Sequence, residues 1–196
     1  MPLAFGGFQD TSKAPVMQDY LLTEKLLKES GLTYTFLREG VYAECFTVIL
    51  GWYLERTGTL TLPADGEVAY TSRAELGEAT ARIMTQCGYE VQTVLFTAQE
   101  TITARELVDI INEITGRQIK LNLVSREEYV SSWRSDPRGK PKEHFEMIAT
   151  VWYEIVSGAL RTTHPLLQEI LGKEPTSPKD FVRKLLEDGR DYVFRY

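Results

Sequence analysis

The sequence has few residues of the kinds that form disulfide or metal frameworks. Its 196 residues include only two cysteines and two histidines. Cys45 and Cys87 are far apart in the sequence and form no Cys-x-x-Cys pair. We interpret them as two buried free thiols. His144 and His164 have no partner at the spacing of metal ligands. We therefore expect neither a disulfide scaffold nor a metal site.

The sequence also lacks an excess of basic residues and a long apolar run. With 22 Lys and Arg against 28 Asp and Glu, the formal net charge is -6. Such a chain would repel a phosphate backbone, so no nucleic-acid partner is expected. No segment approaches the roughly 18 apolar residues of a membrane span, and residues 1–7 lack the basic start and long apolar stretch of a secretory signal. We expect a cytoplasmic protein with no membrane partner.

What the sequence contains is typical of one globular α/β domain. Hydrophobic residues make up 43% and charged residues 26%, and no repeat or flexible linker divides the chain. Short β-forming runs alternate with amphipathic helices, which favours a sheet with helices over a helical bundle. Strands are predicted at 3–8, 33–37, 67–70, 91–96 and 119–123, and helices at 17–27, 72–86, 107–114, 125–133, 143–160 and from Pro178 onward.

Several of these helices carry predicted start and stop signals. Capping boxes, in which a Ser or Thr and a Glu three residues later satisfy free amides, are predicted at Ser72 with Glu75, Thr103 with Glu106, and Ser125 with Glu128. Pro178 suits a first helical position, and Gly31 and Gly116 suit the residue that follows a helix.

Two blocks of the sequence are informative in their order and spacing. The first is YLLTEKLL at 20–27 followed by SGLTYTFLREGVYAE at 30–44, and the second is ADGEVAYTSRAEL at 64–76. Together they resemble the NmrA-like family of atypical short-chain dehydrogenases. The resemblance covers about residues 4–123, and the remainder is similar to the family's variable C-terminal lobe. It implies the C-terminal part of a Rossmann-like NAD(P)-binding fold with a small α/β substrate lobe, as one domain over 1–196. Residues 1–90 would complete the sheet, and 91–196 would form mainly the substrate lobe.

The glycine-rich turn with which a Rossmann fold binds pyrophosphate is absent from the sequence, which has no Gly-x-Gly-x-x-Gly. By the family template the chain starts at about the fifth strand, so we expect the N-terminal strands to be missing. NADP or NAD would then lose its phosphate anchor. The shortened sheet would expose an edge and apolar surface that a second copy or a protein partner would cover.

The resemblance places a cofactor site at the end of the strand near residue 38. Ligands of open α/β sheets lie beyond the carboxyl ends of the strands. By similarity to NmrA-like quinone reductases, the residues that would border the nicotinamide are Glu39, Gly40, Val41, Tyr42, Ala43 and Glu44. The alternative is an ordinary turn in which Arg38 forms a salt bridge, since loop glycines are permissive.

The catalytic residue remains open, with Tyr20 as the one candidate. Short-chain dehydrogenases use Tyr-x-x-x-Lys, in which the lysine lowers the pKa of the tyrosine that acts as general acid. Here the fourth residue after Tyr20 is Glu24, and Lys25 is displaced by about 100° around the helix. Residues 4–7 also lack the usual serine. Ketone reduction by the standard route is therefore not expected, and Tyr20 is either catalytic or a packed helix residue.

The substrate would be a quinone or a small aromatic molecule. Trp133 and Trp152 are candidates for an aromatic pocket, with the hydrophobic core as the alternative. Residues 152–166 resemble fungal averufin-oxidase-like proteins of aromatic polyketide pathways, which implies a role in secondary metabolism. An NAD(P)H-dependent oxidoreductase is thus the first hypothesis. A non-catalytic NmrA-like dinucleotide sensor and an inactive remnant are the alternatives.

Overall fold

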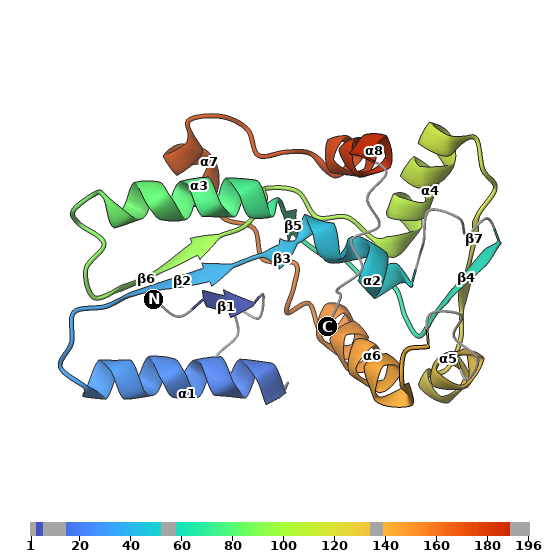
Figure 1. Cartoon of the computed structure of the whole chain (residues 1–196), viewed down its shortest axis with the longest axis horizontal. Helices are drawn as coiled ribbons and strands as arrows, with labels where there is room; N and C mark the ends of the chain where they lie inside the picture. The colour runs from blue at the N-terminus through green and yellow to red at the C-terminus, as the bar shows by residue number, and fades with distance from the viewer. Residues whose placement is uncertain (1–2, 6–14, 52–57, 134–138, 189–196) are drawn as a thin grey trace.

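The computed structural model describes residues 3–5, 15–51, 58–133 and 139–188 (Figure 1). Its elements in chain order are β1 (Leu3–Phe5), α1 (Pro15–Glu29), β2 (Thr35–Glu39), β3 (Val41–Tyr42), the 3-10 turn η1 (Ala43–Cys45), α2 (Phe46–Leu50), β4 (Thr59–Leu62), β5 (Tyr70–Thr71), α3 (Arg73–Met84), β6 (Gln92–Phe96), α4 (Ala104–Thr115), β7 (Lys120–Leu123), α5 (Arg126–Ser132), α6 (Lys142–Val156), α7 (Leu166–Leu171) and α8 (Pro178–Asp188). All of these strands pair in parallel. The expected α/β class is confirmed.

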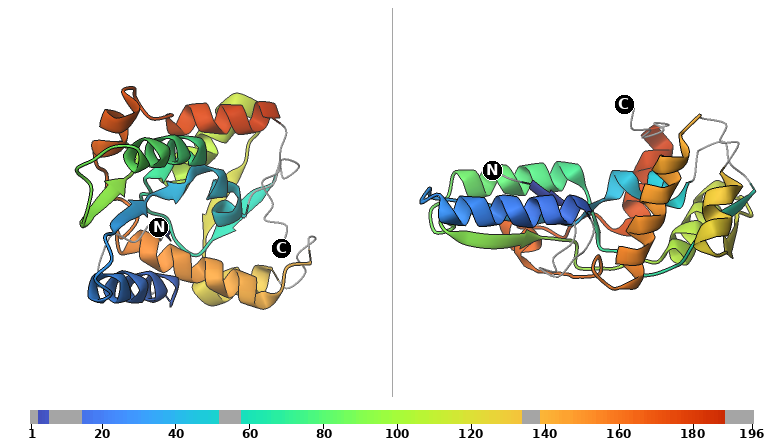
Figure 2. Two further views of the ribbon diagram at one scale, coloured as in Figure 1. Left: turned by 60° about the vertical axis from the view of Figure 1, so that its left-hand side comes forward. Right: turned by 90° about the horizontal axis from the view of Figure 1, so that it is seen from below.

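One half of the molecule is a three-stranded sheet, ordered β1-β2-β6, with α1 on one face and α3 on the other (Figures 1 and 2). Side chains alternate along a strand, so β2 serves both faces. Phe36 and Arg38 lie toward α1, where Lys28 and Glu24 contact them. Leu37 and Glu39 lie toward α3 and pack against residues that include Leu76 and Thr80. A small core joins the sheet to α3 and α7, with Leu37, Leu76, Ala79, Ile83, Val94, Phe96, Leu167 and Leu171 as its buried members.

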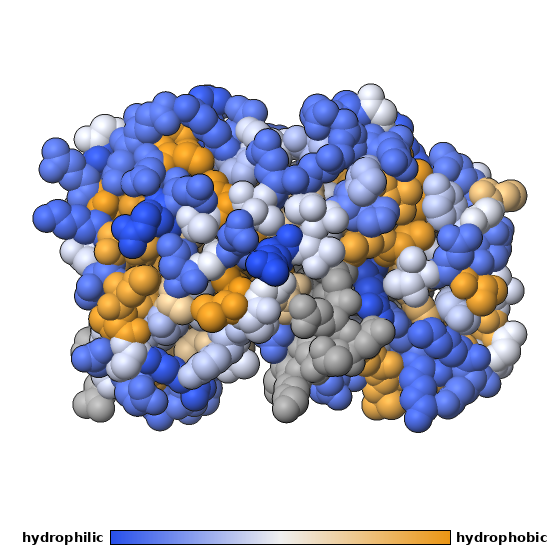
Figure 3. Space-filling view, turned by 180° about the vertical axis from the view of Figure 1, so that it is seen from behind, coloured by the Kyte–Doolittle hydropathy of each residue, from blue (hydrophilic) through white to orange (hydrophobic). Residues whose placement is uncertain are grey.

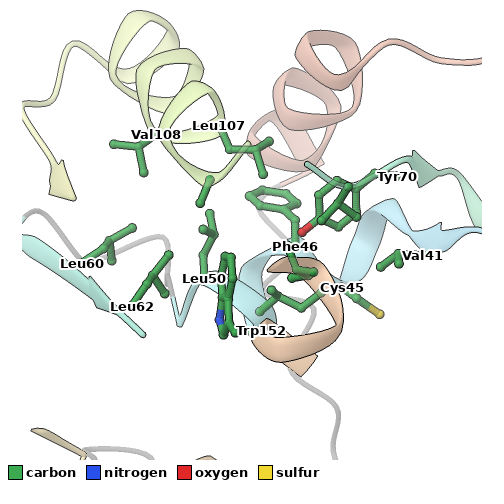
Figure 4. Packing of buried hydrophobic residues seen from close by; sticks show 14 of the residues in the cluster. Val41, Cys45, Phe46, Leu50, Leu60, Leu62, Tyr70, Leu107, Val108 and Trp152 are labelled. Carbon is green, nitrogen blue, oxygen red and sulfur yellow. The ribbon is translucent and has the colours of Figure 1, made fainter. Parts of the chain in front are cut away.

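The other half surrounds a larger core. The short parallel pair β4-β7 and the helices α2, α4, α5, α6 and α8 contribute to it. Figure 4 shows Leu50 and Phe46 of α2 between Leu107 of α4 and Trp152 of α6. The parallel pair β3-β5 lies between the two halves (Figure 1). The division predicted at residue 90 stays a prediction. Each half contains segments from both sides of residue 90: β6, which follows it, pairs with β2, and β4, which precedes it, pairs with β7.

Most predicted elements are present, with shifted ends. The strand predicted at 33–37 runs from Thr35 to Glu39, so Arg38 and Glu39 belong to the strand. The helix predicted at 143–160 ends at Val156, because Gly158 with φ 79° turns the chain away. Residues 6–8 of the first predicted strand lie outside the described residues.

Two of the three predicted capping boxes are confirmed, at Thr103 and at Ser125. In the first, the backbone and hydroxyl of Thr103 hold the pKa of Glu106 below its usual value. The box predicted at Ser72 is wrong, because the Ser72 side chain makes no capping hydrogen bond. Glu75 is buried instead, and its carboxylate accepts hydrogen bonds from the backbone and hydroxyl of Thr176.

Among the described residues, one edge of the three-stranded sheet is β1, which has three residues and pairs with β2 alone. Figure 3 shows the apolar residues of one face in separate patches among polar ones. Exposed large apolar side chains include Leu22 and Leu26 on α1 and Tyr153 and Val156 on α6. Coverage of these surfaces by a second copy or a partner stays a prediction. Among the described helices, none is long and apolar enough to cross a membrane.

Candidate functional site

The turn between β2 and β3 lies at the carboxyl end of β2. Neighbouring residues pack so closely against Gly40 of this turn that only glycine fits there. The N–H of Gly40 donates to the carbonyl of Phe96 at 2.7 Å. A Cβ on Gly40 would lie 2.7 Å from Oγ1 of Thr71 and 3.1 Å from the carbonyl oxygen of Ala69. The space that a side chain at position 40 would occupy is therefore filled by Thr71 of β5 and by Ala69, which precedes β5. This close packing fixes the position of the turn relative to β5 and β6.

Glu39 is a buried carboxyl group at the end of β2, with an exposed fraction of 4%. Its two hydrogen-bond donors are the hydroxyl of Tyr42 at 3.1 Å and the hydroxyl of Thr80 at 3.4 Å. Burial raises the pKa of Glu39, and these two hydrogen bonds offset part of that rise. Among the described residues no Lys or Arg forms an ion pair with it. Glu39 is thus held by hydroxyl groups without a counter-cation.

Tyr42 is half-buried and links the turn to α1. Burial raises the pKa of its phenol, and the charge of the neighbouring Glu39 raises it further. Tyr20 of α1 lies close enough to act electrostatically on the same phenol. The structure therefore brings Tyr20, the candidate catalytic residue, near Glu39 and Tyr42 of the predicted cofactor turn.

Glu44 holds the turn against the start of α3. Both of its carboxylate oxygens lie 3.3 Å from the backbone nitrogen of Arg73, and one lies 3.6 Å from Nε of the same residue. The first free N–H of α3, that of Arg73, is satisfied by Glu44. A carboxylate at a helix N-terminus is also favoured by the helix dipole. In this structure Glu44 acts as an anchor of the turn.

The remaining two residues of the predicted site, Val41 and Ala43, have buried side chains that belong to the larger hydrophobic core. They can therefore offer only backbone groups to a ligand. The neighbouring Cys45 is buried too, and burial raises the pKa of its thiol to about 11. Its thiol is protonated and unreactive at neutral pH. Cys87 is exposed, so the expectation that both cysteines are buried is wrong for this one.

Arg38 forms the salt bridge that the sequence offered as its alternative role. Its Nε and one terminal nitrogen donate to the two oxygens of Glu24 at 2.9 and 2.8 Å. Glu24 is buried, and it occupies the position where a Tyr-x-x-x-Lys motif would carry lysine. The pair ties α1 to β2, and it gives Glu24 a structural role that excludes a lysine-like one.

Both candidate substrate residues lie in the core. The ring of Trp133 stacks on Phe145 at 4.8 Å between centroids and is 8% exposed. Trp152 is 2% exposed and lies beside Leu50 (Figure 4). Its indole Nε1 is buried, and no hydrogen-bond partner for it occurs among the described residues. A direct contact of either tryptophan with a substrate stays a prediction.

The structure adds Thr80 to the candidate site, which the sequence analysis did not single out. Thr80 is a polar residue on the face of α3 that carries the buried residues Leu76, Ala79 and Ile83. A polar side chain at that spacing is the signal that would have identified it. For metals, the described residues contain no group of three or more His, Cys, Asp or Glu side chains that could hold an ion.

Comparison with known proteins identifies relatives along nearly the whole chain, although no family model matches. The NmrA-like family domain-containing oxidoreductase flvB of Aspergillus flavus is 51% identical over 193 residues, which are 98% of this chain and 62% of that protein. Quinone oxidoreductase 2 of Escherichia coli is 26% identical over 90% of this chain and 61% of that protein. The chain thus spans about three fifths of the length of these relatives.

Solved structures show the same fold. The NADPH-dependent quinone oxidoreductase QOR2 of Escherichia coli superposes with a TM-score of 0.83 at 24% identity, over 94% of this chain and 66% of that one. The triphenylmethane reductase of Citrobacter sp., solved with NADP(H), superposes with a TM-score of 0.78 at 26% identity, over 92% and 63%. The Rossmann-like class expected from the sequence is confirmed. The resemblance expected from the sequence is confirmed too: over 98% of its length this chain is similar to an NmrA-like oxidoreductase.

Proposed function

We propose that this chain carries the nicotinamide side of the active site of an NAD(P)H-dependent oxidoreductase whose acceptor is a quinone or another small aromatic molecule. The observation that carries the proposal is the position of residues 39–44. They form a rigid turn at the carboxyl end of a parallel strand, where ligands of such sheets bind. The relatives named as quinone oxidoreductases support the type of acceptor.

The chemistry of the turn fits the nicotinamide and not the phosphates. Its members Glu39, Gly40, Val41, Tyr42, Ala43 and Glu44 include two carboxyl groups and no cation, so their side chains offer no favourable charge to a pyrophosphate. They do offer a phenol and backbone groups, which suit an uncharged ring with a carboxamide. Tyr42 would contact the nicotinamide ring of NADP or NAD, and Gly40 and Ala43 would contribute backbone polar groups. When bound, the reduced cofactor supplies a hydride.

A narrower proposal for the substrate is an aromatic polyketide intermediate of fungal secondary metabolism. It is supported by the resemblance of residues 152–166 to averufin-oxidase-like proteins. A dinucleotide-binding sensor without turnover is the second candidate function. One observation favours the sensor: Glu24, at the position of the usual catalytic lysine, is committed to Arg38.

The test is oxidation of NADPH and of NADH by the protein in the presence of a soluble benzoquinone, together with calorimetric binding of each cofactor. An oxidoreductase consumes reduced cofactor only when quinone is added, and Tyr42→Phe lowers that rate. The matched control is Cys87→Ser at an exposed position far from the turn in the chain, which should leave the rate unchanged. Binding without consumption would establish the sensor, and neither binding nor consumption would establish an inactive remnant.

A further inference from the structure

Glu39 and Tyr42 form a two-residue chain that leads from the interior to the turn. Glu39 is the buried member, and the half-buried Tyr42 is the outer one, with 3.1 Å between the phenol oxygen and the carboxyl oxygen. A buried carboxyl group of a protein normally pairs with a cation or lies in a structural network. Among the described residues no cation pairs with Glu39, and its partners are the hydroxyl groups of Tyr42 and Thr80. A group held in this way can accept and release a proton without breaking an ion pair.

We infer that Glu39 and Tyr42 are a proton relay that delivers a proton to the acceptor oxygen during quinone reduction. The inference rests on the proposed function. The reduced dinucleotide would supply a hydride, which carries both electrons, and its addition leaves the quinone as a hydroquinone oxyanion. The O–H bond of Tyr42 breaks as the proton passes to that oxyanion. The protonated carboxyl of Glu39 then transfers its proton to the Tyr42 phenolate, and water reprotonates Glu39.

The charges around the pair favour this order. Burial raises the pKa of Tyr42 most, and ionised Glu39 raises it further through its charge and its hydrogen bond, so Tyr42 is the stronger acid when Glu39 is neutral. Burial raises the pKa of Glu39, which extends the neutral form toward higher pH. Thr80 opposes this effect, because its hydrogen bond to the carboxylate lowers that pKa.

The other titratable groups around the pair do not replace Glu39. From α1, Tyr20 acts on Tyr42. From β2, Arg38 lies on the opposite face of the sheet with Glu24. From the following turn, Cys45 acts on Tyr42, and Glu44 binds Arg73 at the start of α3. β1 and β6 contribute no titratable side chain, since their sequences are LAF and QTVLF.

The first test is the pH dependence of NADPH oxidation by benzoquinone. Wild type should lose kcat as pH rises through the pKa of Glu39. Glu39→Gln keeps a neutral hydrogen-bonding group that has no proton to transfer, so it should lower kcat and remove that pH dependence. Thr80→Val removes a hydrogen bond to the carboxylate and should move the loss of activity to higher pH. Tyr42→Phe should lower kcat roughly 100-fold or more at pH values where Glu39 is neutral, the usual contribution of a general acid.

A second readout does not depend on turnover. The ¹³C resonance of the Glu39 carboxyl carbon, assigned by its absence in Glu39→Gln, should titrate above the ordinary range of glutamate, and higher still in Thr80→Val. Titration in the ordinary range would overturn the relay. So would quinone reduction with the same pH profile in wild type and Glu39→Gln, and that result would leave the proposed function standing. Cofactor binding without quinone reduction at any pH would overturn both.

Discussion

The carboxylate of Glu44 accepts a hydrogen bond from the backbone N–H of Arg73, with both oxygens 3.3 Å from that nitrogen. A residue of the candidate cofactor turn therefore completes the N-terminus of α3. The sequence predicted a different cap for this helix, a capping box between Ser72 and Glu75. The difference between the two assignments can be measured.

Glu44→Ala should lower the free energy of unfolding by about 1 kcal/mol, the usual cost of losing an acceptor at a helix N-terminus. Ser72→Ala should change it by less than about 0.5 kcal/mol, as at an ordinary surface position. Urea denaturation of both variants checks the pair. If Ser72→Ala cost more than Glu44→Ala, the capping box expected from the sequence would form in solution, contrary to the structure.

Gly40→Ala should destabilise the protein by roughly 1–3 kcal/mol, because the new methyl group would overlap Oγ1 of Thr71 and the carbonyl of Ala69. Gly77 in α3 is the matched control. A Cβ there meets no atom within 4 Å. Gly77→Ala in a helix interior should therefore stabilise by about 0.5–1 kcal/mol. Thermal unfolding of both variants measures the contrast, and equal effects would show that the turn is not tightly packed.

Glu24→Lys restores the Tyr-x-x-x-Lys spacing after Tyr20, yet it should not create a dehydrogenase. It places a second cation beside Arg38 in a buried site, and breaking a buried pair costs roughly 3–5 kcal/mol. The replacement of both partners by apolar residues, Glu24→Leu with Arg38→Met, should cost much less than either single change. A double-mutant cycle in urea gives the coupling energy. Additive effects of the two changes would show that the salt bridge contributes nothing to the fold.

Glu39→Gln should stabilise the protein at neutral pH and have little effect in acid. The pKa of Glu39 is raised in the folded state, so the folded protein binds more protons than the unfolded chain between the two pKa values. Stability from this group is therefore present in acid and is lost as pH rises through that interval. Stability curves of wild type and variant against pH should converge at low pH and separate above it. Curves that separate at low pH instead would reverse the sign of the pKa shift.

The sequence predicted the helices best where local chemistry determines them. Thr103 and Ser125 cap helices through residues three positions away, and Pro178 begins α8, as expected. The box at Ser72 failed because its predicted partner Glu75 binds Thr176, which is 101 positions distant in the chain. Contacts between distant segments have no signature in a local pattern.

The same distinction explains the candidate site. The turn at residues 39–44 could be proposed from a resemblance, but the contact between Glu39 and Thr80 joins β2 to α3 across 41 positions. The short elements α2, β4 and α7 were missed, since segments of four to six residues carry too few positions to show a period. Trp133 and Trp152 illustrate a third limit, because aromatic residues on a helix suit a pocket or a core equally well.

The position of the turn beside the nicotinamide is the central claim, and titration of the ¹⁵N-labelled protein with NADPH tests it most directly. The amide resonances of Gly40, Tyr42 and Ala43 should shift with one common dissociation constant, while those of the distant strand β7 (Lys120–Leu123) stay in place. Shifts confined to other parts of the chain, or no shift of these three amides at saturating NADPH, would contradict the account.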